Sequence, residues 1–340
     1  MTKRYYRPLV RSDFAKPENA KPIAGGWCWF DTVEVIERDG PSRLLSSDDL
    51  PQDVLERLTN DRADVAGLSM SHPQIMGILN VTPDSFSDGG QYDATEAAVM
   101  RAKEMVAEGA SIIDVGGEST RPGADFIPAD VESERVFAPI AGVRTASEVP
   151  ISIDTRKASV AENAVKAGAT LINDVSALTF DVDMTSTVAD AKVPVCLMHA
   201  QGDPKTMQAD PTYRNVLLDV YDFLEESITK AVASGIAREK IIVDPGIGFG
   251  KTLQHNMELL RGLSLFHGLG CPILLGASRK RFIGELGQAP DAKDRMAGSV
   301  SVALFGVSQG VQILRVHDTY ETKQALDLHM AMIGAHGDGT

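Results

Sequence analysis

Polar or ionisable side chains follow short apolar runs at eight places in this chain. They are Asn80, Asp114, Asp154, Asn173, His199, Asp244, Ser278, and Arg315 with His317. Among these, Asp154, Asn173 and Asp244 could exchange hydrogen bonds with a planar heterocycle that carries amino and ring N–H groups. Arg315 and His317 are two residues apart, so on a strand they would share one face and could hold a phosphate group. We therefore expect one pocket for a polar heterocycle with an anionic substituent.

Loop residues could complete the anion-binding part of such a pocket. Arg121, in the glycine-rich stretch 116–123, could join Arg315 and His317 around a pyrophosphate, with Asn80 beside them. The stretch 80–90 is long for a connection between a strand and a helix and is rich in turn residues, which favours a mobile lid.

Three further residues have two open interpretations each. Lys280 either reaches the pocket or begins a helix in solvent, and Phe249 is either an apolar wall for an aromatic substrate or a core residue. His199 is either a ligand-binding residue or a satisfied residue at a strand end. The stretch 244–252 superficially resembles a phosphate-binding loop, but Pro245 stands where the Walker A pattern requires glycine, so we expect no nucleotide there.

Alternating strands and helices would position these residues. The apolar runs are short and continuous, as in parallel strands buried on both faces, and helical patterns separate them. Eight such units predict a (β/α)8 TIM barrel over residues 73–340, with its chemistry at the carboxyl ends of the strands. An open doubly wound sheet is the alternative, although no Gly-x-Gly-x-x-Gly follows the first strand. The predicted strands are 75–79, 112–115, 151–153, 171–172, 193–198, 241–243, 273–275 and 311–316; the predicted helices are 94–108, 129–146, 159–167, 183–191, 214–234, 253–266, 292–306 and 320–335.

Residues 1–72 form an N-terminal extension that lacks the regular alternation of apolar runs and helical patterns. The run 32–36 with the following polar turn predicts one arm of a β-hairpin, and 47–62 predicts a short helix capped by Asp48 or Asp49. We expect residues 27–36 to plug the bottom of the barrel and the rest to be a loosely packed lead. Deleting residues 1–20 should then leave activity intact.

Composition excludes several classes of protein. The 340 residues carry a net charge of −14, which argues against nucleic-acid or membrane-surface binding, although a local cationic cluster can still hold a small anion. Cys28, Cys196 and Cys271 are too few and too widely spaced for a disulfide framework or a zinc site. No apolar stretch approaches the roughly 18 residues of a membrane span. These features predict a cytoplasmic protein that acts on small molecules.

Several motifs, in order along residues 74 to 340, resemble the dihydropteroate synthase family of pterin-binding enzymes. The two longest are 76–90, which begins Met-Gly-Ile-Leu-Asn, and 114–123, which reads Asp-Val-Gly-Gly-Glu-Ser-Thr-Arg-Pro-Gly. Shorter matches are Ser-Ile-Asp-Thr at 152–155, Ile-Asn-Asp at 172–174, Met-His at 198–199, Asp-Pro-Gly at 244–246, Ser-Arg-Lys at 278–280 and Arg-Val-His-Asp at 315–318.

The resemblance implies a homodimeric TIM barrel of folate biosynthesis. This family condenses 6-hydroxymethyl-7,8-dihydropterin pyrophosphate with 4-aminobenzoate, with Mg²⁺, to give 7,8-dihydropteroate and pyrophosphate. It implies catalytic roles for Asp154, Lys280 and Arg315, a Mg²⁺ contact for Asn80, and a closing loop that contains Phe86 and Asp88. The implied substrate-binding residues are Asp154, Asn173, Asp244 and Lys280 for the pterin; Arg121, Arg315 and His317 for the pyrophosphate; Thr120, Pro122, Phe249 and Ser278 around the 4-aminobenzoate, in the pocket that sulfonamides occupy; and Met198 and Gly276 beside them.

Two alternative functions share this barrel. A methyltetrahydrofolate–corrinoid methyltransferase needs no pyrophosphate cluster, so Arg121, Arg315 and His317 argue against it. A non-catalytic pterin-binding paralogue is opposed by four intact site residues, which are Asn80, Asp154, Lys280 and Arg315.

Overall fold

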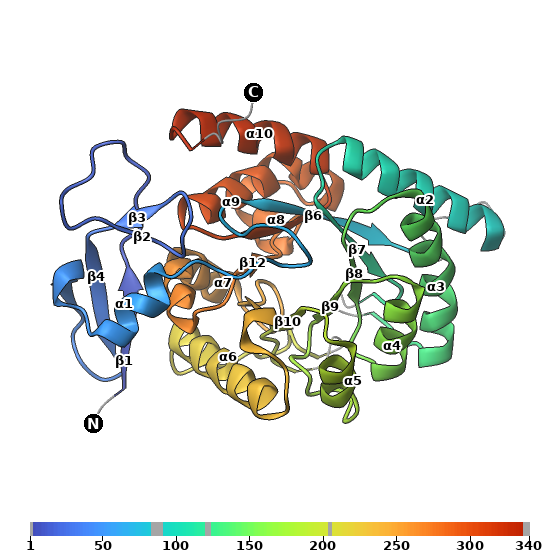
Figure 1. Cartoon of the computed structure of the whole chain (residues 1–340), viewed down its shortest axis with the longest axis horizontal. Coiled ribbons are helices and arrows are strands. Elements are labelled where there is room, and N and C mark those ends of the chain that lie inside the picture. The colour runs from blue at the N-terminus through green and yellow to red at the C-terminus, as the bar shows by residue number, and fades with distance from the viewer. Residues whose placement is uncertain (1–2, 83–90, 120–123, 203–205, 336–340) are drawn as a thin grey trace.

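A closed barrel of parallel strands makes up most of this computed structural model, which describes residues 3–82, 91–119, 124–202 and 206–335 (Figure 1). Its strands are β6 (Gln74–Asn80), β7 (Ile112–Gly116), β8 (Ile151–Asp154), β9 (Leu171–Asp174), β10 (Val195–Met198), β11 (Ile241–Asp244), β12 (Leu274–Leu275) and β13 (Ile313–Val316). Their spatial order is β11-β10-β9-β8-β7-β6-β13-β12, and a parallel bridge between Val243 and Ile273 joins the two ends. The predicted TIM barrel is confirmed, and the open doubly wound sheet is wrong.

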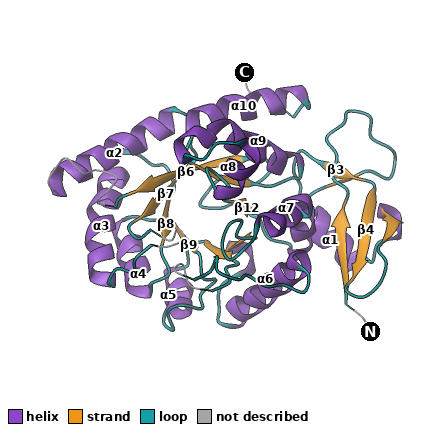
Figure 2. Cartoon of the chain, turned by 180° about the vertical axis from the view of Figure 1, so that it is seen from behind, coloured by secondary structure: helices purple, strands orange, loops and turns teal. Residues whose placement is uncertain are grey.

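Helices surround this barrel on the outside (Figure 2). They are α2 (Gln91–Ala107), α3 (Ala129–Ala146), α4 (Ala158–Ala167), α5 (Met184–Ala191), α6 (Val216–Ala233), α7 (Leu253–Arg261), α8 (Arg281–Gly287), α9 (Met296–Ser308) and α10 (Thr319–Met332). The predicted helix 253–266 ends early at Gly262, and a 3₁₀ segment, η4 (Leu263–Leu269), continues the chain. The chain packs closely against α6 at this point, because a Cβ on Gly262 would lie 2.5 Å from the Leu217 side chain. We did not predict α8, since seven residues with two glycines leave too short a pattern.

The strands expose alternate residues to the barrel interior, which explains the polar pocket. One inward layer is apolar and consists of Met76, Ile112, Leu171, Cys196, Ile242, Leu274 and Ile313. Two residues further along each strand, the same face carries Ile78, Asp114, Asn173, Met198, Asp244, Gly276 and Arg315. The polar side chains therefore form one layer directly above an apolar floor.

The N-terminal extension lies against the side of the barrel (Figure 1). Its strands β1 (Arg4–Pro8), β4 (Thr32–Glu37) and β5 (Arg43–Ser46) form an antiparallel sheet, so the predicted hairpin arm is confirmed. A small ribbon of β2 (Lys21–Pro22) and β3 (Trp29–Phe30) and the helix α1 (Gln52–Thr59) complete it. The cap of α1 differs from prediction: Pro51 is the N-cap, while Asp48 and Asp49 belong to a preceding 3₁₀ turn.

The bottom of the barrel is closed by residues other than those predicted. Val65 and Met70 pack against the apolar inward layer, whereas Phe30 and Val33 pack inside the extension against Leu58. The predicted plug at 27–36 is therefore wrong. The buried side chains of this segment are used in the extension's own core, so they are not available to fill the barrel.

The lead of the extension is not loosely packed either. Tyr5 is buried, and its hydroxyl donates to Asp222 of α6 at 2.9 Å. Lys3 bridges Asp222 and Glu225, each at 2.5 Å, and Arg38 binds Asp222 at 2.6 Å. These contacts fasten the extension to the barrel.

In the described part of the chain, no helix is both long enough and apolar enough to cross a membrane.

Candidate active site

Arg315 joins two buried carboxylates at the centre of the polar layer. From β13, its Nε donates to Asp114 Oδ2 on β7 and its Nη2 donates to Asp154 Oδ2 on β8, both at 2.6 Å. Asn173 on β9 donates to the same Asp114 oxygen at 3.5 Å. Asp114 was among the polar residues expected to follow apolar runs and line the pocket, but no binding or catalytic role was predicted for it. Its inward position on β7, shared with the other site residues, was the available signal.

The two carboxylates also present free acceptors to the barrel interior. Among the described residues, Asp114 Oδ1, Asp154 Oδ1 and Ser152 Oγ have no hydrogen-bond partner although they are buried. Burial raises the pKa of Asp154 to about 7, which the Arg315 charge opposes and the Asp114 charge reinforces. Unsatisfied buried acceptors are costly, so this arrangement suits a ligand that brings N–H donors.

A second wall of the pocket comes from the loops after β11 and β12. Asp244 Oδ1 accepts from the Gly246 amide at 2.7 Å, and burial raises the Asp244 pKa while Lys280 opposes this. The Lys280 ammonium donates to the Ile247 carbonyl and lies 4.4 Å from the centre of the Phe249 ring. Burial lowers the pKa of Lys280 to about 7. Lys280 is therefore half-buried against Phe249, and its interpretation as a fully solvated side chain is wrong.

Two inward glycines leave open space between the polar groups. A Cβ on Gly276 would lie 3.5 Å from Asp244 Oδ2 and 3.8 Å from Arg315 Cδ. A Cβ on Gly116 would lie 3.7 Å from both Asn80 Oδ1 and Asp154 Cβ. These positions are sterically allowed for alanine, so the missing methyl groups widen the floor of the pocket.

The other predicted residues lie at the rim or outside the described residues. Ser278 Oγ accepts from the His317 amide at 3.2 Å and lies 3.0 Å from His317 Nδ1, so these two side chains meet. Met198 is buried at the carboxyl end of β10, with its side chain on the inward face. His199 is also buried, and its Nδ1 lies 2.9 Å from Lys251 Nζ. Five predicted residues, Phe86, Asp88, Thr120, Arg121 and Pro122, lie outside the described residues.

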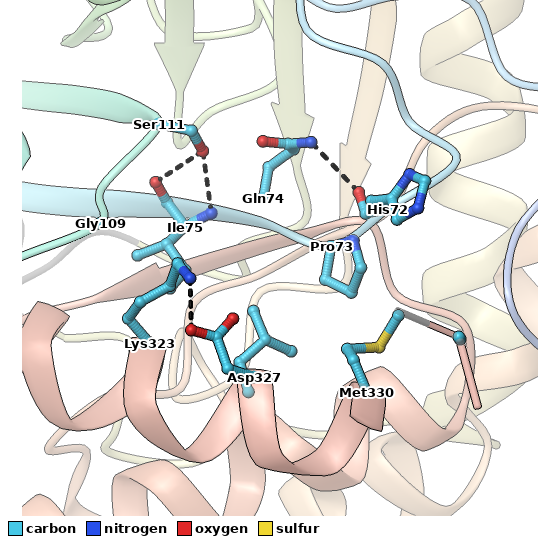
Figure 3. Close-up of a pocket in the computed structure, with 11 residues that line it drawn as sticks. His72, Pro73, Gln74, Ile75, Gly109, Ser111, Lys323, Asp327 and Met330 are labelled. Atoms are coloured by element: carbon cyan, nitrogen blue, oxygen red, sulfur yellow. Dashed lines mark hydrogen bonds and ion pairs between the residues drawn. The ribbon is translucent and has the colours of Figure 1, made fainter. Parts of the chain in front are cut away.

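A separate pocket of about 260 Å³ lies beside α10, between residues that begin β6 and precede β7 (Figure 3). Its polar groups are paired: Ser111 Oγ lies 3.1 Å from the Ile75 amide, and Lys323 binds Asp327 at 2.5 Å. It adjoins the amino ends of the strands, opposite the ends that carry Asp154 and Arg315. This pocket is therefore distinct from the candidate active site.

Comparison with known proteins agrees with this geometry. A family described as "Pterin binding enzyme" matches residues 76–317. The chain belongs to the pterin-binding enzyme family.

This pterin-binding enzyme resembles dihydropteroate synthases across the barrel. It is 45% identical over 268 residues to the dihydropteroate synthase of Escherichia coli strain K12, which covers 79% of this chain and 94% of that one. The structure of the Xanthomonas albilineans dihydropteroate synthase with 4-aminobenzoic acid has a TM-score of 0.75 and 44% identity, covering 80% of this chain and 97% of that one. The same enzyme in complex with 7,8-dihydropteroate has a TM-score of 0.72 and 41% identity, covering 80% and 98%. The resemblance read from the motifs is confirmed.

Proposed function

We propose that this pterin-binding enzyme is a dihydropteroate synthase, which joins 6-hydroxymethyl-7,8-dihydropterin pyrophosphate to 4-aminobenzoate and releases pyrophosphate. The observation that carries the proposal is the cluster of Arg315, Asp114 and Asp154, whose unpaired carboxylate oxygens face the barrel interior. The similar enzymes from E. coli and X. albilineans carry this name, and the latter binds 4-aminobenzoic acid and 7,8-dihydropteroate.

In this proposal the strand ends hold the pterin. Asp154 and Asp244 accept hydrogen bonds from its amino and ring N–H groups, and Asn173 and Lys280 offer donors to its carbonyl and ring nitrogen. The space that Gly276 leaves between Asp244 and Arg315 supports a flat ligand there. An analogue without the N–H donors would leave buried carboxylates unpaired and would bind poorly.

The chemistry requires charge stabilisation on both sides of the bond that breaks. As the C–O bond to pyrophosphate breaks, positive charge develops on the methylene carbon and negative charge on the leaving oxygens. Asp154 stabilises the positive charge, while Arg315, His317 and Arg121 receive the pyrophosphate. The amine of 4-aminobenzoate then attacks the methylene carbon and loses a proton, so no covalent enzyme intermediate forms.

We further infer that Asn80 contributes to a Mg²⁺ site with the pyrophosphate. The described residues contain no group of three or more His, Cys, Asp or Glu side chains that could hold a metal alone. Mg²⁺ commonly binds through substrate phosphates, waters and one or two protein oxygens, and Asn80 Oδ1 borders the space above Gly116. When bound there, Mg²⁺ would neutralise charge on the leaving pyrophosphate.

The 4-aminobenzoate would enter beside Phe249 and Ser278, with Thr120 and Pro122 from the neighbouring loop. Phe249 is half-buried and lies over Lys280, which supports an aromatic wall next to the pterin. The loop with Phe86 and Asp88 would close over both substrates.

We also infer a homodimer that works in the cytoplasm. Leu328 and Met332 are exposed and four residues apart, so they are neighbours on the surface of α10, and a second copy could cover them together with the exposed Tyr320. The three cysteines are buried free thiols, which suits a reducing compartment.

A product assay with purified protein tests the function. We expect release of pyrophosphate and formation of 7,8-dihydropteroate only when pterin pyrophosphate, 4-aminobenzoate and Mg²⁺ are all present. Pyrophosphate release without 4-aminobenzoate would contradict the proposal. Methyl transfer from methyltetrahydrofolate to a corrinoid would establish the alternative, and binding without turnover would indicate the non-catalytic paralogue.

A further inference from the structure

Four consecutive backbone carbonyls in the loop after β11 each accept a hydrogen bond from a side chain. The donors are Lys280 Nζ to Ile247, Gln208 Nε2 to Gly248 at 2.6 Å, Lys251 Nζ to Phe249 at 3.0 Å and Tyr213 Oη to Gly250 at 2.7 Å. Carbonyls in surface loops usually bind water, so four side-chain donors in succession hold this backbone in one conformation.

Lys251 makes the most buried of these contacts. Its side chain is nearly inaccessible, and its Nζ lies 3.0 Å from the Phe249 carbonyl, 3.3 Å from the His199 carbonyl and 2.9 Å from His199 Nδ1. Three donors of an ammonium match these three acceptors. Burial lowers the Lys251 pKa well below its usual range, and a neutral amine could still donate to both carbonyls and accept from Nδ1–H. All three contacts are available in either protonation state.

The backbone of this loop also lies unusually close to the end of β10. Gly246 and Gly250 have φ values of +68° and +62°. A Cβ on Gly246 would collide with the carbonyl oxygen of His199, and a Cβ on Gly250 with that of Gln201. Glycine permits both the left-handed conformation and the close approach. His199 therefore contacts the loop twice: it binds Lys251 Nζ, and its carbonyl packs against Gly246.

We propose that Lys251 is a positioning residue that fixes the ring of Phe249 as the wall of the 4-aminobenzoate site. The inference rests on the proposed function. Lys251 binds the carbonyl of Phe249 itself, and the Phe249 ring in turn lies 4.4 Å from Lys280 Nζ. Of the four proposed pterin-binding residues, Asp154 and Asn173 stand on strands outside this loop. Asp244 and Lys280 do contact it, but at the Gly246 amide and the Ile247 carbonyl and not at Phe249. Loosening the loop should therefore affect 4-aminobenzoate more than the pterin.

The test is the variant Lys251→Met, which keeps an unbranched side chain one atom shorter than lysine and removes the donors. We expect its KM for 4-aminobenzoate to rise at least tenfold, while the KM for pterin pyrophosphate changes less than threefold. The exposed Lys166→Met on α4 is the matched control and should leave both values unchanged. In a Phe249→Ala background, Lys251→Met should change the 4-aminobenzoate KM less than twofold, because both changes act through one ring.

Circular dichroism and thermal unfolding establish whether Lys251→Met folds. If it folds with an unchanged KM for 4-aminobenzoate, the inference is overturned. If it does not fold, Tyr213→Phe replaces it, since this variant removes only the neighbouring contact with Gly250; an unchanged KM there also overturns the inference. Failure of the wild-type protein to make dihydropteroate would instead refute the proposed function.

Discussion

Replacing Asp154 with Asn should strongly reduce turnover without weakening the fold. Asparagine keeps the shape of the side chain and an oxygen that can accept from Arg315, but it removes the negative charge. A carboxylate about 4 Å from a unit positive charge contributes about 4 kcal/mol at an effective dielectric constant near 20. Only part of this is specific to the transition state, so we expect turnover to fall at least a hundredfold, which is about 2.7 kcal/mol.

Asp154→Asn should lower turnover but should not lower the free energy of unfolding, because the Asp154 carboxylate is buried. Its pKa is about 7 in the folded chain and about 3.9 in an unfolded chain. Between these values the folded protein holds a proton that the unfolded chain has lost, so wild-type stability falls as pH rises through this window. The full cost is at most roughly 4 kcal/mol and is reached above pH 7. Asp154→Asn lacks this cost, so at pH 8 it should be at least as stable as the wild type.

Urea unfolding followed by circular dichroism at pH 5 and pH 8 measures this difference. Relative to Asp154→Asn, the wild type should lose roughly 2–3 kcal/mol between the two pH values. Equal pH dependence in both proteins, or a variant clearly less stable at pH 8, would refute the electrostatic reasoning. Near-normal dihydropteroate formation by the variant would refute the catalytic role.

Four other changes test separate parts of the structure. Arg315→Ala should fold but cut turnover at least a hundredfold and lower the free energy of unfolding by roughly 3–5 kcal/mol, because two buried carboxylates lose their partner; unchanged stability would contradict this. Since the Lys280 ammonium loses its proton as pH rises through about 7, kcat/KM should decline on the alkaline side, and Lys280→Met should lack that decline in a pH–rate profile. Removing residues 1–20 deletes β1 and the buried Tyr5, so differential scanning calorimetry should show a Tm lower by roughly 5 °C or more. An unchanged Tm would mean that this segment is loosely packed, as the sequence predicted. Gly276→Ala should raise the KM for pterin pyrophosphate at least tenfold with little change in Tm, and an unchanged KM would mean that the ligand does not use this space.

The barrel could be predicted from sequence because its strands depend on local pattern. A parallel strand buried on both faces needs a continuous apolar run, so the eight strands were recognisable one at a time. The predicted helix 129–146 coincides with α3. The predicted helix 253–266 is too long, because α7 ends before Gly262. That helix ends where α6 packs against it, and such a contact cannot be seen in a local pattern.

Part of the site could be predicted for the same reason. Asp154, Asn173 and Asp244 end their apolar runs, and strands of one barrel bring their carboxyl ends to one rim. The partnership of Arg315 with Asp114 could not be predicted, since they are 201 residues apart and β6 lies between their strands. Which inward residues meet across a barrel depends on the register of every strand between them.

The amino-acid sequence by itself determined the (β/α)8 class, the polar rim and the relationship to pterin-binding enzymes, because each follows from local periodicity or contiguous motifs. Only the tertiary structure decided the ionic cluster at Asp154, the docking of the extension through Tyr5, the plug at Val65 and the hold of Lys251 on the Phe249 loop. Each of these features joins segments that are far apart in the sequence. Their side chains come into contact and lose water only when the chain folds, and this loss of water shifts their pKa values.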